Sequence, residues 1–385
     1  DRGKPTEVLA ACAALCKQDP RFTPLCLKYR ADALRDLNQH EALEKFLNAI
    51  LADRPLPWAY AMLGRLLFKR GQVKHAQGLY ETALKAFPMM PALYDGLADV
   101  LVAQGDAKRA QSVLEEAVRL SPLAVRRQSQ LGKLALANED FETSSRAYRN
   151  AVAQGQQSRF KDPESNLGLA QALISKGSER GLDTRTRLEI NNALGLVAKE
   201  NPGDQGLQVR ARLMKATSLL INDAETAEKL TEQAMARLDG MEQFMSAEAA
   251  LLVAKQLQQL GQAEAGASML KNCAEIYGDD PVVMQGIAKL TDDPAILNAG
   301  NAAADLNRQG VRAYKAGGLT EARELFRGAL LLQPKNISIA LNMAQSLLHG
   351  TDPKADAPLF DECRACLKMV GMIPESDARY PRYQK

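Results

Sequence analysis

Cys363 and Cys366 form a Cys-x-x-Cys pair, a spacing found in zinc sites and in thiol–disulfide chemistry. A zinc site needs a second pair of ligands, and a redox motif of the thioredoxin kind needs a strand beside it. Neither is visible in the sequence, and the three scattered histidines include no pair at metal-ligand spacing. We interpret the two cysteines as small buried side chains on a helix, and keep a thiol-dependent enzyme as an alternative function.

Adjacent carboxylates, which could act in acid–base chemistry, occur at Glu115–Glu116, Asp279–Asp280 and Asp292–Asp293. Consecutive side chains on a helix point about 100° apart, so the two glutamates cannot converge on one substrate. The two aspartate pairs precede prolines and are typical of turns and helix N-caps. No glycine-rich phosphate loop or nucleophile elbow is present. We therefore expect no catalytic residue, no metal and no cofactor.

The composition indicates a helical globular chain. Its 385 residues are 46% hydrophobic and 25% charged, which is enough for two or more domains. Ala, Leu, Gln, Glu, Lys and Arg dominate, and these side chains lose little rotamer freedom in a helix. Segments with the period-two alternation of strands are nearly absent. The sequence therefore predicts an all-α fold.

Net charge and cysteine content restrict the kinds of partner and the location that we expect. The 49 basic and 46 acidic residues are evenly spread and leave a formal charge of +3, with no basic block of the kind that binds nucleic acid. No signal peptide and no apolar run of about 20 residues appears, so we expect no membrane association. The six cysteines lie mostly among alanines and leucines, which favours reduced thiols and a cytoplasmic location.

One phrase recurs after 34 residues: GQVKHAQGLYETALKAFP at 71–88 and GDAKRAQSVLEEAVRLSP at 105–122. The position that opens the second half of each repeat gives five copies at this spacing, namely Val8, Ala42, Ala76, Ala110 and Ser144. Four residues later come Cys12, Phe46, Tyr80, Leu114 and Tyr148, and three further on Leu15, Ala49, Ala83, Ala117 and Ala151. In this register the turn near Leu37–Asn38 is one residue short.

This pattern resembles the tetratricopeptide repeat family, whose period is 34 and whose signature runs large–Gly, Ala, aromatic, Ala and Pro. The match is strongest at 57–124, good at 23–54 and 125–152, and returns at 303–336. One departure is Glu139, which replaces the turn glycine. The resemblance implies an α-solenoid of antiparallel helix pairs, tetratricopeptide and degenerate, that forms a right-handed superhelix.

About nine helix pairs are expected, in three blocks. The predicted divisions are an N-terminal block of about four and a half repeats (1–153), a polar connection (154–165), degenerate helix pairs (166–290), a linker or hinge (291–302), a C-terminal repeat with a capping helix (303–370) and an irregular tail (371–385).

The resemblance also implies a concave groove, lined by the first helix of each repeat, that takes an extended or helical segment of a partner. The groove positions fall on Trp58, Arg65 and Lys69, then Asp95 and Asp99, then Arg126 and Lys133. This order gives a basic, an acidic and a basic ring. Packing of Trp58 against the preceding repeat, and ordinary solvation of the charges, are the alternatives.

One subgroup of the family binds chaperone C-terminal carboxylates through Lys and Asn side chains on successive first helices. Asp95 and Asp99 stand at the corresponding places in this chain. Their carboxylates would repel such a ligand, so this use is not expected.

We therefore predict a non-catalytic scaffold that binds protein or peptide partners. The chain is similar in style to the tetratricopeptide tails of bacterial receiver-domain response regulators, which implies an output arm that acts on a signalling enzyme. It begins with Asp rather than Met, and DRGKP is typical of a linker end, so we expect a further domain upstream. The alternative is an assembly or transport chaperone for envelope or pilus machinery. Homo-oligomer formation stays open.

Overall fold

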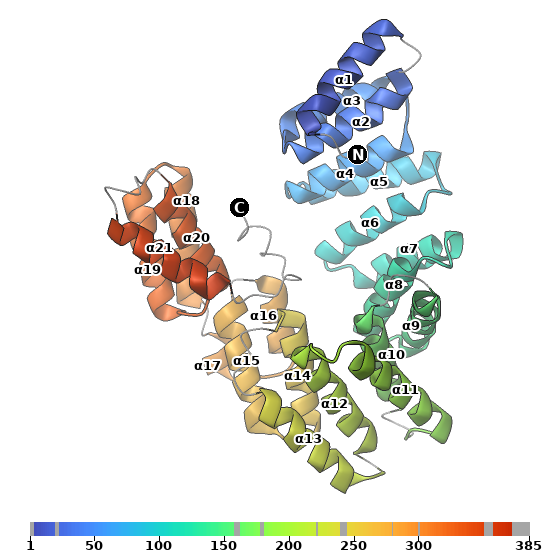
Figure 1. Ribbon diagram of the computed structural model, residues 1–385, viewed down its shortest axis with the longest axis vertical. Helices are drawn as coiled ribbons and strands as arrows, with labels where there is room; N and C mark the ends of the chain where they lie inside the picture. Colours follow the sequence, from blue (N-terminus) through green and yellow to red (C-terminus); the bar gives the residue numbers. More distant parts are fainter. Residues whose placement is uncertain are drawn as a thin grey trace. The chain divides into compact units, whose positions relative to one another are not determined.

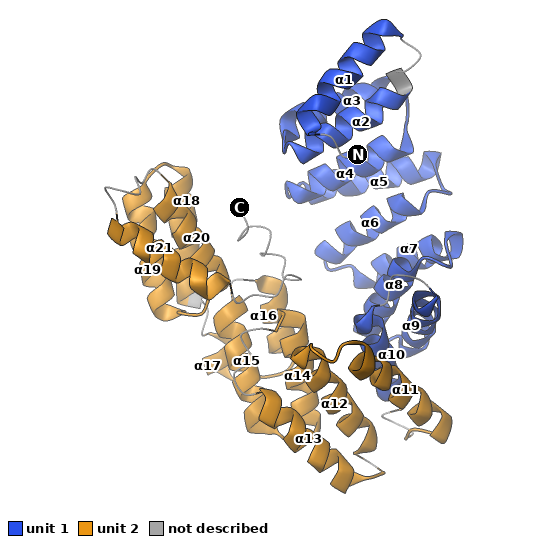
Figure 2. Cartoon of the chain, in the orientation of Figure 1, with its two compact units in different colours: residues 1–176 blue, residues 177–385 orange. Residues whose placement is uncertain are grey.

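The computed structural model describes residues 4–19, 23–157, 162–177, 181–220, 222–238, 245–278, 280–298, 301–349 and 357–371. The chain forms two compact units, Asp1–Lys176 (unit 1) and Gly177–Lys385 (unit 2) (Figure 2). This division lies after the polar connection expected at 154–165. Apart from Gly371, the tail expected at 371–385 lies outside the described residues.

Every regular element in the described residues is an α-helix, which confirms the predicted all-α fold (Figure 1). Unit 1 contains α1 (Pro5–Gln18), α2 (Thr23–Asp36), α3 (His40–Asp53), α4 (Pro57–Lys69), α5 (Val73–Ala86), α6 (Pro91–Ala103), α7 (Ala107–Leu120), α8 (Val125–Ala137), α9 (Phe141–Gln156) and α10 (Pro163–Gly177). Unit 2 contains α11 (Thr184–Glu200), α12 (Gln205–Leu219), α13 (Ala224–Leu238), α14 (Ala247–Gln259), α15 (Ala263–Tyr277), α16 (Pro281–Ala288), α17 (Pro294–Leu297), α18 (Asn301–Lys315), α19 (Leu319–Leu332), α20 (Ile337–Leu348) and α21 (Ala357–Val370).

Among the described residues, six helix pairs share one three-residue turn. Its middle residue has a left-handed backbone: Asn38, Gly71, Gly105, Glu139, Gly261 and Gly317, with φ between 55° and 86°. The residue after it donates its backbone N–H to a carbonyl in the last turn of the first helix, as Gln72 does to Leu67 at 2.9 Å. This geometry ends one helix and reverses the chain within three residues. Glu139 is unusual here because side chains other than glycine and asparagine rarely adopt this conformation.

The repeat register predicted for residues 40–53 is wrong by one residue. Ala42 and Ala49 are exposed and Phe46 is half-buried, whereas Leu43, Leu47 and Ile50 are buried in the core. The turn at 37–39 has the usual three residues. The missing residue lies in the connection to the next repeat, which has three residues at 54–56 but four at 87–90 and at 121–124. Consequently α3 and α5 begin 33 residues apart, and α5 and α7 begin 34 apart.

Aromatic side chains join neighbouring repeats in unit 1. Tyr80 on α5 is 2% exposed, and a Cβ added at Gly64 on α4 or at Gly96 on α6 would lie 2.5 or 2.3 Å from its Cζ. Tyr148 on α9 occupies the same place between Gly132 on α8 and Gly168 on α10. In each case a tyrosine ring from the second helix of one repeat packs against the first helix of its own repeat and that of the next. Both first helices need glycine at the point of contact.

The segments between the predicted blocks are partly helical. In the polar connection predicted at 154–165, α9 continues to Gln156 and α10 begins at Pro163, with 158–161 outside the described residues. The linker predicted at 291–302 contains the short helix α17, whose N-cap Asp293 accepts a hydrogen bond from the Ala295 N–H at 2.8 Å.

The core of unit 2 extends to the last described helix. In the C-terminal region α18 packs against α19, and α20 packs against α21, so the helix expected to act as a cap is the second member of a pair. Cys363, Cys366 and Val370 on α21 are buried in the same apolar cluster as Phe326 on α19. Phe326 also lies against Gly310 on α18, where an added Cβ would be 2.6 Å from its ring.

Candidate functional site

The predicted groove residues lie on α4, α6 and α8, the first helices of three successive repeats of unit 1 (Figure 1). Pro57 and Pro91 begin α4 and α6, where a missing backbone N–H costs nothing. In each helix one face carries the buried leucines and glycine, which leaves the opposite face for the predicted residues. The predicted residues therefore share the corresponding face of the first helices of three successive repeats.

Four of the predicted residues influence one another. Asp99 remains exposed at the surface, but partial desolvation of its carboxyl raises its pKa; the Asp95 carboxylate adds to this shift, while Arg65 and Arg126 act in the opposite direction. Arg65 and Asp99 also act on the hydroxyl of Tyr80, whose pKa burial raises to about 12. Arg65, Asp95 and Arg126 thus each act on Asp99, and these four side chains form one group of mixed charge.

Sequence analysis missed a further member of this group, Arg127. Its Nε and Nη2 donate to the two carboxylate oxygens of Asp95 at 2.7 and 2.8 Å, and its Nη1 donates to Ser121 Oγ at 2.8 Å. Both side chains of the ion pair are mostly buried, with 21% and 26% of their surface exposed. Two adjacent arginines, at 126 and 127, were visible in the sequence. Only Arg126 falls on a groove position of the repeat, so Arg127 was not predicted.

The three remaining predicted residues are not part of this mixed-charge group. Trp58 is half-buried and packs against the apolar core of unit 1. Lys69 lies exposed in the last turn of α4, and Lys133 lies exposed on α8, two turns after Arg126. The contact of Trp58 with the core agrees with the packing alternative, and its exposed part is still available to a partner.

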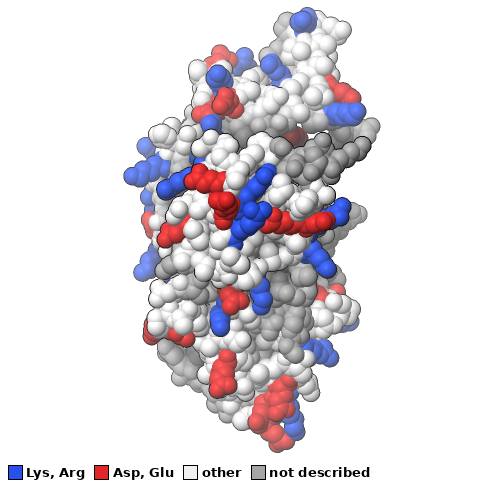
Figure 3. All heavy atoms as spheres, turned by 90° about the vertical axis from the view of Figure 1, so that its left-hand side faces the viewer, with Lys and Arg blue, Asp and Glu red and all other residues white. Residues whose placement is uncertain are grey.

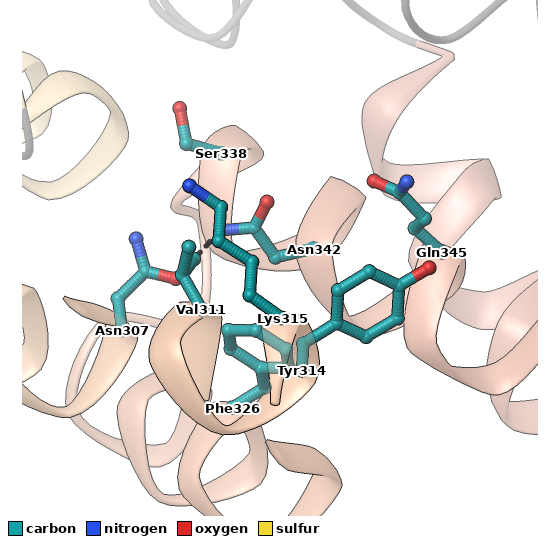
Figure 4. A pocket seen from close by; sticks show the side chains of 8 residues that line it. All are labelled: Asn307, Val311, Tyr314, Lys315, Phe326, Ser338, Asn342 and Gln345. Carbon is teal, nitrogen blue, oxygen red and sulfur yellow. Dashed lines mark hydrogen bonds between the residues drawn. The ribbon is translucent and has the colours of Figure 1, made fainter. Parts of the chain in front are cut away.

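Unit 2 contains a second candidate site, a pocket of about 420 Å³ between α18, α19 and α20 (Figure 4). It is lined by Asn307, Val311, Tyr314, Lys315, Phe326, Ser338, Asn342 and Gln345. Asn342 Nδ2 donates to Asn307 Oδ1 at 2.7 Å, and the Tyr314 hydroxyl and His349 Nδ1 lie 3.0 Å apart. Sequence analysis did not predict this pocket, because its polar residues follow no recognised motif.

The cysteines and aspartates that were first considered for chemistry have structural roles. Cys363 and Cys366 are buried, and burial raises the pKa of both thiols, that of Cys366 to about 11. Such thiols stay protonated near neutral pH, whereas nucleophilic cysteines need the thiolate. The predicted N-caps are confirmed for Asp280 and Asp293, whose carboxylates accept hydrogen bonds from Val282 and Ala295 N–H groups. Asp279 lies outside the described residues.

Within the described ranges, no group of three or more His, Cys, Asp or Glu side chains is arranged to hold a metal ion. The helices of those same ranges are each too short or too polar to cross a bilayer. On the face shown in Figure 3, the described basic and acidic side chains lie interspersed.

Stacked antiparallel helix pairs joined by these turns define an α-solenoid. Residues 61–125, which cover α4 to α7 apart from the first turn of α4, match the model of the tetratricopeptide repeat family. Residues 61–125 are thus similar to tetratricopeptide repeats, and proteins with such repeats bind protein or peptide partners. No curated protein matches the chain.

Several solved structures resemble the chain in part. A tetratricopeptide repeat protein from Parabacteroides merdae is 16% identical, with 69% of this chain and 98% of that one covered and a TM-score of 0.49. The C-terminal part of a repeat protein from Cytophaga hutchinsonii is 14% identical, with 68% and 98% covered and a TM-score of 0.44. YrrB, described as having an unusual peptide-binding site, is 18% identical, with 50% and 92% covered and a TM-score of 0.42. The helix packing of this chain and the match at 61–125 define the fold.

Proposed function

We propose that this protein is a scaffold that binds a protein or peptide partner through the exposed face of α4, α6 and α8. The observation that supports this most is the mixed-charge group formed by Arg65, Asp95, Asp99 and Arg126 on successive first helices. A partner segment with complementary charges would meet several of these side chains at once. Charge complementarity of this kind sets the register and the partner rather than the bulk affinity.

Trp58 supplies the apolar part of the proposed surface. Its side chain packs partly on the core, which limits its rotamers before a partner binds. Tryptophan and arginine are frequent anchors of protein interfaces, because a large and already ordered side chain loses little entropy on binding. Lys69 and Lys133 would lie at the edge of the surface and act mainly on the rate of association.

In the finer proposal, the repeats are the output arm of a bacterial signalling protein of the response-regulator type and hold a signalling enzyme. The support is the similarity in style of the repeats to the tails of such proteins. The alternative, an assembly or transport chaperone for envelope or pilus machinery, uses the same surface for a different client. A thiol-dependent enzyme receives less support, because Cys363 and Cys366 are buried and their pKa values are raised.

Affinity capture from extracts of the native cell tests the surface. The wild type is compared with a Trp58→Ala/Arg65→Glu double variant and with Lys74→Glu, a control that reverses an exposed charge on α5 of the same repeat. The proposal expects partners to be recovered with the wild type and with Lys74→Glu, and lost with the double variant. Equal recovery with all three proteins would refute the proposed surface. A captured signalling enzyme would favour the output arm, and captured pilus or envelope subunits would favour the chaperone.

A further inference from the structure

We propose that Cys16 on α1 and Cys26 on α2 form a redox-responsive pair, which a hydroperoxide converts into a reversible disulfide between the two helices. This inference concerns the first helix pair of unit 1 and does not depend on the surface proposed on α4, α6 and α8. Three observations support it: the thiols meet between the helices, the two positions face each other, and only one thiol of the pair reaches the surface.

Three thiols meet where α1 packs against α2 (Figure 1). Cys12 and Cys16 lie one turn apart and therefore on the same face of α1. The Cys26 thiol on α2 hydrogen-bonds with both of them. All three cysteines are free thiols, so the structure contains the proposed pair in its reduced form.

Cys16 and Cys26 occupy facing positions of this helix pair. Cys16 lies two residues before the end of α1 at Gln18, and Cys26 lies three residues after the start of α2 at Thr23. A short connection makes the two helices antiparallel, so residues at similar distances from it lie opposite each other. Packed helix axes lie about 8–10 Å apart and each Cα lies about 2.3 Å from its axis, which leaves roughly 3.5–5.5 Å between facing Cα atoms. This range overlaps the roughly 4.4–6.8 Å that a disulfide needs.

The thiols differ in their access to an oxidant. Cys16 is half-buried, whereas Cys26 is only 2% exposed and Cys12 only 7%. The hydrogen bond with Cys16, followed by burial and the hydrogen bond with Cys12, raises the pKa of the Cys26 thiol to about 12. A hydrogen bond that raises this pKa is one in which the Cys26 S–H donates, so Cys26 keeps its proton near neutral pH. The first reaction with an oxidant therefore falls to Cys16.

The reaction has two steps. The Cys16 thiolate attacks one oxygen of the hydroperoxide, the O–O bond breaks, and Cys16 becomes a sulfenic acid while water or an alcohol leaves. The Cys26 sulfur then attacks the Cys16 sulfur, the S–O bond breaks, and the released hydroxide takes the Cys26 proton to form water. The two thiols lose two electrons, which the hydroperoxide gains. A reducing thiol restores both cysteines by thiol–disulfide exchange.

Three other cysteines serve as an internal comparison. Cys363 and Cys366 also lie within one turn of a helix, α21, but both are buried, and burial raises the pKa of each thiol. Cys273 on α15 is buried in the same way, which raises its pKa to about 12. Buried thiols that stay protonated are inert toward oxidants, so oxidation should be confined to the first helix pair.

Oxidation of the full chain with hydrogen peroxide, followed by blocking of the remaining thiols and digestion with trypsin without reductant, tests the pair. Trypsin leaves Cys12 and Cys16 in peptide 3–17 and Cys26 in peptide 22–28, so mass spectrometry detects the disulfide as a linked pair of these peptides. The wild type is compared with Cys16→Ala, with Cys26→Ala and with Cys12→Ala, a matched control that removes the neighbouring thiol from the same face of α1. Far-ultraviolet circular dichroism of each variant shows whether the helices are retained.

The proposal expects the wild type and Cys12→Ala to form the linked peptides, and dithiothreitol to separate them. Cys16→Ala and Cys26→Ala should give at least tenfold less of the link, and Cys26→Ala should retain a sulfenic acid at Cys16 that dimedone labels. No link in the wild type, a link that joins two chains on a non-reducing gel, an undiminished link in Cys16→Ala, or equally fast oxidation of Cys363 and Cys366 would each overturn the proposal. The wild-type result decides whether the disulfide forms even where a variant loses its fold.

Discussion

Arg127 on α8 holds both carboxylate oxygens of Asp95 on α6, at 2.7 and 2.8 Å. The two residues are 32 positions apart and belong to successive repeats. Their ion pair lies on the face where the sequence predicted an acidic ring, so the Asp95 charge is largely neutralised from within the protein. A cationic partner would have to compete with Arg127, which leaves Asp99 as the more available carboxylate.

The ion pair should contribute to the stability of unit 1. Because it is bidentate and mostly buried, a double-mutant cycle of Asp95→Ala and Arg127→Ala should give a coupling free energy of about 1 kcal/mol or more. The exposed pair Arg119–Glu116 on α7 is the control, and exposed ion pairs contribute little to stability because water screens them. Urea unfolding of the full chain measures both cycles. Equal coupling in the two cycles would contradict the importance of burial.

Asp99 should make stability depend on pH. Partial desolvation, together with Asp95, raises its pKa above the ordinary 3.8, so the folded state holds this proton more tightly than the unfolded state does. The resulting stabilisation is present below pH 3.8 and is lost as the pH rises through the folded-state pKa. Asp99→Asn should therefore raise the melting temperature at pH 7 and leave it nearly unchanged below pH 3.8, where Asp99 is protonated in both states. A lower melting temperature at pH 7 would show that Arg65 and Arg126 outweigh desolvation.

Any residue larger than glycine at position 96 should lower the free energy of unfolding, because the Tyr80 ring occupies the space beside it. A Cβ at Gly96 would lie 2.3 Å from Tyr80 Cζ and 2.5 Å from its hydroxyl oxygen. Gly96→Ala should lower the free energy of unfolding by about 1–3 kcal/mol, the usual cost of overpacking a core. Gly78→Ala is the matched control, because nothing lies within 4 Å of a Cβ at that position on α5. That variant should gain up to about 1 kcal/mol of helix propensity, and a loss at both sites would refute the explanation.

Glycine at position 139, in the turn between α8 and α9, should raise the stability of the protein. Glu139 has φ 62°, the left-handed conformation that Gly105 supplies at φ 82° in the preceding repeat. Glu139→Gly should stabilise the protein by about 0.5–1 kcal/mol, because relief of backbone strain exceeds the added entropy of the unfolded chain. Gly105→Ala should destabilise it by about 1 kcal/mol for the converse reason. Urea midpoints of the two variants should move in opposite directions.

The fold was predictable because the repeat places glycine, alanine and large side chains at positions that packing demands. Ala76, Tyr80 and Ala83 are all buried, as the register predicted. The error at 40–53 arose because a fixed spacing cannot locate a residue missing from an exposed connection. Burial of large residues, which Leu43 and Leu47 satisfy, would have located it.

The candidate sites were less predictable because they depend on side-chain geometry across repeats. A helical position rule selects one residue in each turn, and it cannot decide which of two adjacent arginines reaches Asp95. The same limit applies to Asn307 and Asn342, which are 35 residues apart and meet only once α18 and α20 are packed together. Both pairs follow from tertiary structure. The adjacent arginines indicate that a cation is available but not which one pairs with Asp95, and the two asparagines have no sequence signal.

The place of Tyr80 between two repeats has a consequence for how unit 1 opens. If α5 detaches locally, Gly64 and Gly96 both lose their covering ring, so α4 and α6 are exposed together. Tyr148 couples α8 and α10 in the same way. Opening is therefore transmitted from one repeat to its nearest neighbour. Fluctuations of unit 1 would involve groups of three helices, and a partner bound to any one of them would restrain all three.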